Sequence, residues 1–140
     1  MLGRGRRACA AAISNNAAPM RLYALRGANT VSENEARAIL DATDELMREM
    51  MDRNGLRTDA IVSCIFTMTP DIDAEFPAVA ARRLGFDRVP LLCAREVAVP
   101  GSLPRVIRVL VHYYDEDEHR PQHVYLREAR SLRSDLDAAQ

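Results

Sequence analysis

The sequence contains neither lysine nor tryptophan, and all 19 basic side chains among its 140 residues are arginine. Without lysine, the chain can form no Schiff base or pyridoxal-phosphate anchor, and it has no lysine to place in a phosphate-binding loop. Any anion that it binds must be held by arginine side chains, backbone N–H groups or dipoles. The lack of tryptophan also disfavours recognition that depends on large aromatic side chains.

Other missing features exclude further classes of protein. Cys9, Cys64 and Cys93 are odd in number and show no CxxC spacing, which argues for a reducing compartment and against a disulfide framework or zinc site. Three of the 19 arginines precede residue 20 and no acidic residue does, so from there onward 16 arginines face 20 acidic residues. Nucleic-acid binding favours the opposite balance. No apolar run approaches the ~18 residues of a membrane span.

Length and composition predict one domain, which we place at residues 20–133. Residues 1–19 differ in composition, and their apolar stretch at 8–13 is too short for a signal peptide. Two interpretations of this segment stay open: a disordered extension, or a start site set upstream of a true start at Met20. Residues 134–140 are expected to form a flexible C-terminal tail.

Hydrophobic periodicity predicts an α+β fold with a mixed β-sheet and helices packed on one side. The expected elements are, in chain order, a strand at 20–26, a turn at 27–31, a helix opened by a capping box at 32–35 and closed at 54–55, a strand at 60–68, a helix at 76–84, strands at 89–94, 106–114 and 123–126, and a polar segment after them. This inventory leaves a sheet edge or face exposed, and self-association usually buries such a surface.

Two arginines interrupt the predicted strands. Arg108 stands in a run where both strand faces are otherwise apolar, and an unpaired guanidinium costs several kcal/mol to bury. It requires a buried salt bridge, an edge strand open to water, or a binding site. Arg26 ends an apolar strand just before Gly27, where it is either an ordinary exposed side chain or part of a site.

Cys93 and Glu96 form a third candidate pair at the end of a predicted strand. Residues three apart in a straight strand face opposite ways, so the chain must turn or bulge if both serve one site. Cys93 can equally be a small core residue, and no spacing supports a nucleophile–histidine dyad with His112 or His123. These histidines and His119 show no metal-ligand spacing, and we interpret them as surface or sheet residues.

Five segments together resemble the small, monofunctional AroH-class chorismate mutases. They are LRGANTV (25–31), TPDIDAEFPAVAAR (69–82), VPLLCAREV (89–97), PGSLPRVIRVLVH (100–112) and HVYLREARSLR (123–133). The resemblance runs in order through essentially all of residues 20–133. It implies a homotrimer with a pseudo β/α-barrel fold, active sites in clefts between subunits and a cytoplasmic location.

The resemblance also implies a set of site residues. Those from one chain are Arg26, Cys93, Glu96, Arg108 and Tyr125. Those that line the cleft from a neighbouring chain are Phe76, Arg82 and Leu132, with Arg133 near its mouth. In these roles Arg108 lies beside the substrate ether oxygen, Arg26 and Tyr125 hold a carboxylate, and Glu96 and Cys93 hold the ring hydroxyl. Phe76 would pack on the ring, while Arg82 and Arg133 would steer the dianion inward.

The implied reaction is the Claisen rearrangement of chorismate to prephenate, in phenylalanine and tyrosine biosynthesis. This intramolecular exchange of a C–O bond for a C–C bond needs no nucleophile, metal or cofactor. It needs a held conformer and stabilised charge, tasks for which arginine is well suited. Two alternatives remain on a similar trimeric scaffold: an imine deaminase of the RidA type, and a non-catalytic regulator that binds a carboxylate.

Overall fold

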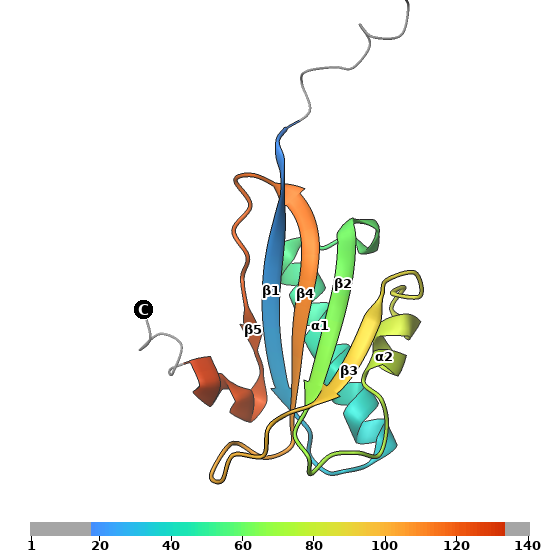
Figure 1. The fold of residues 1–140 in the computed structure, drawn as a ribbon, viewed down its shortest axis with the longest axis vertical. Coiled ribbons are helices and arrows are strands. Elements are labelled where there is room, and N and C mark those ends of the chain that lie inside the picture. The colour runs from blue at the N-terminus through green and yellow to red at the C-terminus, as the bar shows by residue number, and fades with distance from the viewer. Residues whose placement is uncertain (1–17, 134–140) are drawn as a thin grey trace, which may run out of the picture.

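One mixed sheet of strand order β3-β2-β4-β1-β5 organises the computed structural model, which describes residues 18–133 (Figure 1). The elements are β1 (Met20–Thr30), α1 (Ala36–Asn54), η1 (Thr58–Ala60), β2 (Ile61–Met68), α2 (Ala78–Arg83), β3 (Leu91–Arg95), β4 (Val106–Glu116), β5 (Val124–Tyr125) and η2 (Arg127–Arg130). The central strand β4 is antiparallel to β1 and β2, whereas β3 and β5 add to the edges in parallel. The predicted mixed α+β sheet is confirmed.

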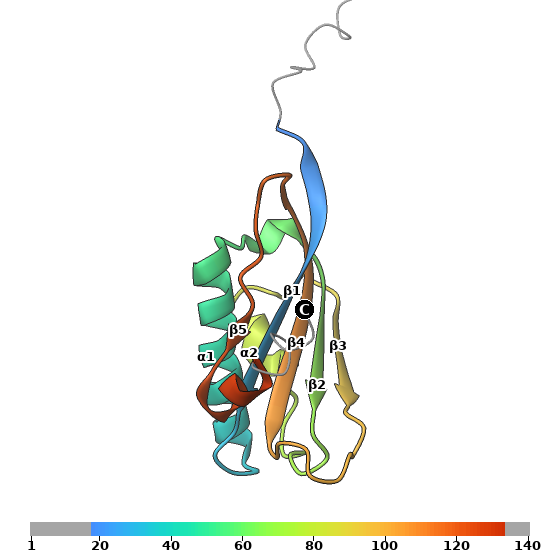
Figure 2. The same cartoon turned by 90° about the vertical axis from the view of Figure 1, so that its left-hand side faces the viewer.

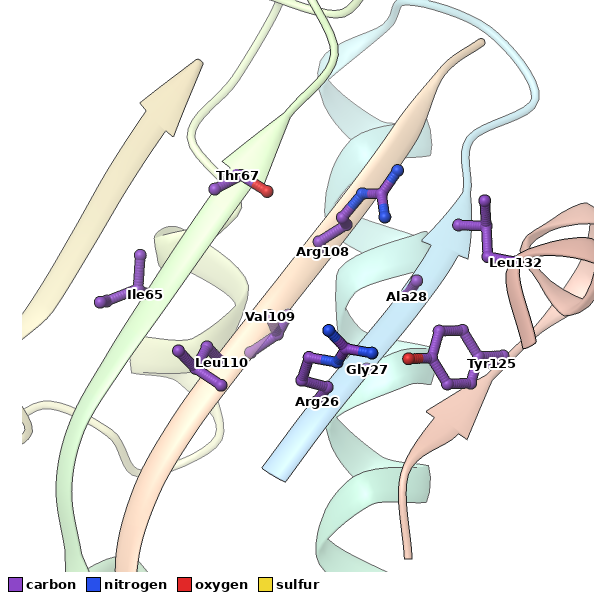
Figure 3. A pocket seen from close by; sticks show the side chains of 10 residues that line it. All are labelled: Arg26, Gly27, Ala28, Ile65, Thr67, Arg108, Val109, Leu110, Tyr125 and Leu132. Atoms are coloured by element: carbon purple, nitrogen blue, oxygen red, sulfur yellow. The ribbon is translucent and has the colours of Figure 1, made fainter. Parts of the chain in front are cut away.

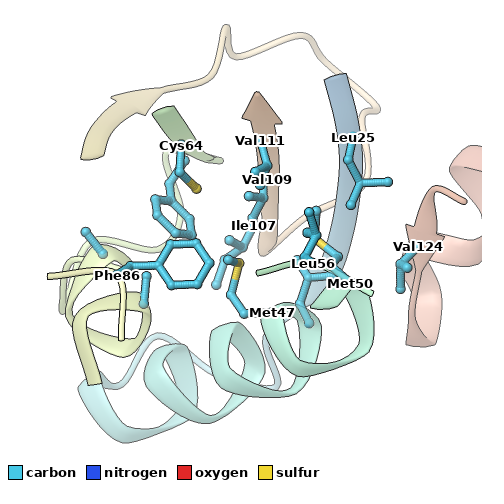
Figure 4. Packing of buried hydrophobic residues seen from close by; sticks show 14 of the residues in the cluster. Leu25, Met47, Met50, Leu56, Cys64, Phe86, Ile107, Val109, Val111 and Val124 are labelled. Atoms are coloured by element: carbon cyan, nitrogen blue, oxygen red, sulfur yellow. The ribbon is translucent and has the colours of Figure 1, made fainter. Parts of the chain in front are cut away.

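The helices cover a single face of this sheet, as predicted (Figure 2). Successive strand residues alternate in burial because their side chains point to opposite faces, and the inward set meets the apolar stripe of α1. Figure 4 shows this core, which includes Leu25, Met47, Met50, Val109 and Val111. No helix in residues 18–133 is long and apolar enough to cross a membrane.

The turn predicted at 27–31 is wrong, because β1 continues as a strand to Thr30. Gly27 serves a different purpose from a turn. A Cβ added there would collide with the Met50 sulfur and lie 3.1 Å from Leu46 Cδ1. Glycine therefore lets α1 approach the strand closely without breaking it.

The predicted capping box is also wrong. Helix α1 begins at Ala36 with Glu35 as its N-cap, and no side chain caps it. Asn34 instead bonds to a distant loop: its Oδ1 accepts the Asp73 N–H at 2.9 Å, and its Nδ2 donates to Asp73 Oδ1 at 2.8 Å. The predicted helix stop is confirmed, since Gly55 adopts φ 58° in the left-handed region.

The C-terminal part of the described chain is helical rather than a simple polar segment. Helix η2 and the helical residues that follow it reach residue 133. Ala129 is fully buried with Ala28 and Val106, and Leu132 and Tyr125 pack against this cluster. The expectations for the two termini concern residues 1–19 and 134–140, of which residues 1–17 and 134–140 lie outside the described part of the chain.

The sheet face opposite α1 carries exposed apolar side chains, including Leu22, Val62, Leu92 and Tyr114. The ladder partners Leu92, Ile65 and Leu110 form a row across β3, β2 and β4 on this outer face, and the row ends at Arg26 on β1. The outer face is therefore apolar across the middle of the sheet and basic beyond it.

Candidate active site

Arg26, Arg108, Tyr125 and Leu132 line one pocket of about 490 Å³ on the outer face of the sheet (Figure 3). Strands β1, β4 and β5 supply the first three, and the helical turn after η2 supplies Leu132. The remaining lining residues are Gly27, Ala28, Ile65, Thr67, Val109 and Leu110. The structure thus brings together residues that lie as much as 106 positions apart in the sequence.

Strand register explains why the two arginines share this pocket. Arg26 pairs with Leu110 and Ala28 pairs with Arg108, so the arginines are diagonal neighbours on one face of an antiparallel pair. Ala28 also pairs with Tyr125 across the parallel edge. The small side chain of Ala28 separates Arg108 from Tyr125 and leaves space between them. Two fixed cations beside a phenol form a site suited to a substrate with carboxylate groups.

Glu96 forms an ion pair with Arg108, with Glu96 Oε1 2.6 Å from Arg108 Nε. The Glu96 side chain is only 16% exposed and that of Arg108 is 44% exposed. Within the described residues, the second carboxylate oxygen, Oε2, is buried and has no hydrogen-bond partner. One acceptor atom beside the Arg108 guanidinium is therefore left without a donor in the described chain.

Cys93 lies on the opposite face of the sheet from Arg108. It pairs with Phe66, which in turn pairs with Val109, and this row faces the helices. Cys93 and Glu96 are three positions apart, so an extended chain points them to opposite faces, and the β2–β3 pairing is regular through Arg95. The Cys93 side chain packs against the core and lines a separate pocket of about 310 Å³ with Phe76 and Arg95.

Of the residues expected from a neighbouring chain, three lie outside the pocket of their own chain and one lines it. Phe76 is 64% exposed and Arg82 is exposed on α2, and neither lines the pocket of its own chain. Arg133, the last described residue, is exposed as well. Leu132 lines the Arg26 pocket of its own chain, because the helical residues after η2 pack over Ala28, and its expected role in the cleft of a neighbouring chain stays a prediction.

His123 is a residue near the site that sequence reasoning missed. Its Nδ1 accepts the Arg26 backbone N–H at 3.0 Å, so the ring holds β1 at the residue that bears the guanidinium. Burial, and then the charge of Arg26, lower the pKa of His123 below its usual 6.5. In the sequence, the only sign of this role is that His123 lies two residues before Tyr125. The pairing of β1 with β5 shows that it lies opposite Arg26.

The other two histidines have structural partners away from the pocket. His119 lies between Asp115 Oδ2 at 3.2 Å and the Tyr113 hydroxyl at 2.7 Å, and His112 Nδ1 lies 3.1 Å from Ser63 Oγ. Burial is the main cause that raises the pKa of Tyr113 to about 12. Among residues 18–133 no cluster of histidine, cysteine and carboxylate side chains is arranged to hold a metal ion.

Comparison with known proteins identifies the family. The model of the family described as chorismate mutase type I matches residues 22–136. The chain belongs to the type I chorismate mutases. The match spans every site residue that the resemblance implied, and it displaces the imine deaminase alternative.

Individual type I chorismate mutases agree with this assignment. The chain is 53% identical to chorismate mutase AroH of Thermus thermophilus, over 83% of this chain and 97% of that protein. It is 35% identical to chorismate mutase AroH of Bacillus subtilis, over 84% of this chain and 94% of that protein. A solved chorismate mutase from Clostridium thermocellum superposes with a TM-score of 0.75 at 47% identity, covering 79% of this chain and 99% of that one. The likeness therefore extends to the whole fold that positions the site.

Proposed function

We propose that this chain converts chorismate to prephenate in the pocket of Arg26, Arg108 and Tyr125. The observation that carries the proposal is the pair of arginines fixed on one sheet face, with the Glu96 carboxylate bonded to Arg108 at 2.6 Å. Membership of the type I chorismate mutases supports it. The product would enter phenylalanine and tyrosine biosynthesis.

The proposed mechanism is conformational and electrostatic. In the rearrangement the ether C–O bond breaks as a C–C bond forms within one molecule, and no proton or electron leaves the substrate. Arg26 binds a carboxylate as a fork, with the Tyr125 hydroxyl as an additional donor, and this holds the folded conformer. Arg108 donates to the ether oxygen as negative charge develops there. A single preorganised donor of this kind contributes about 3–4 kcal/mol to catalysis.

Glu96 completes the site in this proposal. Its bonded oxygen fixes the Arg108 guanidinium, and its free Oε2 accepts the hydroxyl of the substrate ring. Because the Cys93 side chain faces the helices, its contribution to the ring hydroxyl comes through the main chain. The two oxygens of Glu96 thus have different tasks. One orients Arg108, and the other accepts a hydrogen bond from the substrate hydroxyl.

A homotrimer with sites between subunits accounts for the remaining features. The exposed apolar residues of the outer face supply a surface for association. In that assembly Phe76 of one protomer packs on the substrate ring of the next, while Arg82 and Arg133 attract the dianion. Free Cys64 and Cys93 favour a reducing compartment, and we place the enzyme in the cytoplasm.

Turnover of chorismate tests the proposal. Purified protein should consume chorismate and release prephenate, followed by absorbance and by analysis of the product. A protein that binds chorismate and leaves it unchanged would instead be a regulator that kept the carboxylate pocket. A mass of the assembly in solution tests the trimer independently.

A further inference from the structure

Thr69 links the end of β2 to the start of β4. Its backbone N–H donates to Val106 O at 3.1 Å, and its side-chain Oγ1 accepts the Val106 N–H at 2.9 Å. The residue is buried. Thr69 Oγ1 thus takes the place of a main-chain acceptor, and the hydrogen bonds between the two chain segments continue one residue beyond the end of β2.

Asp71 orients the Thr69 hydroxyl. Its Oδ1 accepts the hydroxyl proton at 2.5 Å, so the lone pairs of Thr69 Oγ1 remain for Val106, and its Oδ2 accepts the Arg105 N–H at 2.9 Å. Desolvation acts to raise the pKa of Asp71, but the hydrogen bonds from Thr69 and Arg105 outweigh it and the pKa is lowered. The carboxylate therefore stays ionised and acts as an acceptor on both sides.

Arg105 is held in a conformation that an L-residue rarely adopts. Its φ is 50°, in the left-handed region that costs energy for any residue except glycine. Besides the bond to Asp71, its carbonyl accepts the Val31 N–H at 2.8 Å, and its Nε donates to Val31 O at 2.9 Å. Three contacts hold this turn, immediately before β4, in place.

The same junction determines the main-chain positions of both members of the Glu96–Arg108 pair. The Glu96 N–H donates to Met68 O at 2.8 Å, and Met68 directly precedes Thr69. Val106, which Thr69 holds at both its N–H and its carbonyl, lies two residues before Arg108 on the same strand face. Met68 and Thr69, two adjacent residues at the end of β2, therefore determine the distance between the main chains of Glu96 and Arg108.

The other end of the β2–β4 ladder does not fix the alignment of the two strands in this way. The register there shifts between Ile61 and Ser63, a bulge that disrupts regular pairing. From Ser63 to Met68 the ladder is regular, with Thr67 opposite Arg108, and Thr69 extends the alignment of the two strands beyond the end of β2.

We propose that Thr69 and Asp71 are positioning residues for the rearrangement, which hold the Arg108 guanidinium and the Glu96 carboxylate at their working separation. The inference rests on the proposed function, because it assigns these residues to the part of the site that stabilises the transition state. They do not touch the substrate. Their loss should lower kcat much more than it raises KM, because Arg26 and Tyr125 hold the substrate carboxylate from β1 and β5 and only the contact of Glu96 with the ring hydroxyl is disturbed.

Thr69→Val tests the proposal, because it keeps the shape of the side chain and removes the hydroxyl. We expect kcat to fall about tenfold to a hundredfold, the scale of a small misplacement of a catalytic group, with KM within about threefold of the wild-type value. Thr69→Ser keeps the hydroxyl and should recover most of kcat. Asp71→Asn removes the acceptor that orients the hydroxyl and should lower kcat in the same way.

Thr43→Val is the matched control. Thr43 is also buried, and its Oγ1 donates to Ile39 O at 2.7 Å within α1. This variant should lower the melting temperature and leave kcat unchanged. All variants are assayed as the full chain below their melting temperatures, which are measured in parallel.

The outcomes separate the inference from the proposed function. If wild-type protein turns over chorismate but Thr69→Val and Asp71→Asn keep its kcat, the positioning role is wrong and the function stands. An equal loss of kcat in Thr43→Val would mean that reduced stability causes the effect, and it would also overturn the inference. Should Thr69→Val fail to fold, Asp71→Asn and Thr69→Ser decide the question. Lack of turnover in the wild type would overturn the proposed function itself.

Discussion

Replacing Arg108 by alanine removes the cation that we place beside the ether oxygen. The Arg108 side chain is 44% exposed, so solvent screens part of its ion pair with Glu96, but the Glu96 side chain is only 16% exposed and loses its partner in the variant. We expect this change to cost about 1–3 kcal/mol of stability. Such a loss leaves a domain of ordinary stability folded. Loss of one preorganised donor costs catalysis more, about 3–4 kcal/mol, which lowers kcat at least ~10²–10³-fold. Activity should therefore collapse while the protein stays folded, with a lowered melting temperature that remains above the assay temperature.

The assay is the initial rate of chorismate loss at saturating substrate, with a thermal melt on the same sample. Arg48→Ala is the matched control, because Arg48 forms a 2.8 Å ion pair with Asp44 on the surface of α1. It should keep wild-type kcat. Arg108→Lys should recover only part of the activity, since an ammonium restores the charge without the fork. A loss of less than tenfold in Arg108→Ala would refute the assigned role.

Three further predictions test other parts of the account. Arg26→Ala should raise KM at least tenfold and lower kcat less, because its bond to a carboxylate is present before the rearrangement begins; steady-state kinetics that show kcat alone changing would contradict this role. His123 has a lowered pKa, so kcat/KM should fall only as the pH drops below that value, when the protonated ring stops accepting the Arg26 N–H; His123→Asn should flatten this acid limb, and an unchanged limb would exclude His123 as its source. The unfolded chain binds the His123 proton at higher pH than the folded chain, so this group makes stability rise with pH between the lowered pKa and the ordinary value of 6.5. Gly27→Ala should reduce the free energy of unfolding by about 1–3 kcal/mol through overpacking against Met50, and denaturant unfolding that shows no loss would refute the close approach.

Local pattern was sufficient to predict most of the fold. The order of strands and helices follows from apolar periodicity, and the stop at Gly55 follows from its left-handed conformation. The errors occurred where a distant contact decides the outcome. Gly27 resembles a turn residue until Met50 is known to lie against it, and Asn34 resembles part of a cap until Asp73 is known to bond it. Neither partner can be inferred from neighbouring residues.

The candidate site was predictable to a similar extent and for a related reason. Arg26 and Arg108 stood out because they break apolar strands, Glu96 stood out with Cys93 at the end of a strand, and family resemblance added Tyr125. The roles described for His123 and Thr69 depend on strand register, which periodicity does not specify. The positions of Phe76 and Arg82 relative to a neighbouring pocket stay a prediction of the proposed trimer.

The central claim is that this chain catalyses the rearrangement with its own side chains. The most direct measurement is the conversion of chorismate by the purified full-length protein, with and without a metal chelator, and with the product identified by mass spectrometry and nuclear magnetic resonance. We expect complete conversion to prephenate, an isomer of unchanged mass, at the same rate in both samples. Chorismate that is bound but recovered intact, or a rate that disappears with chelation, would contradict it.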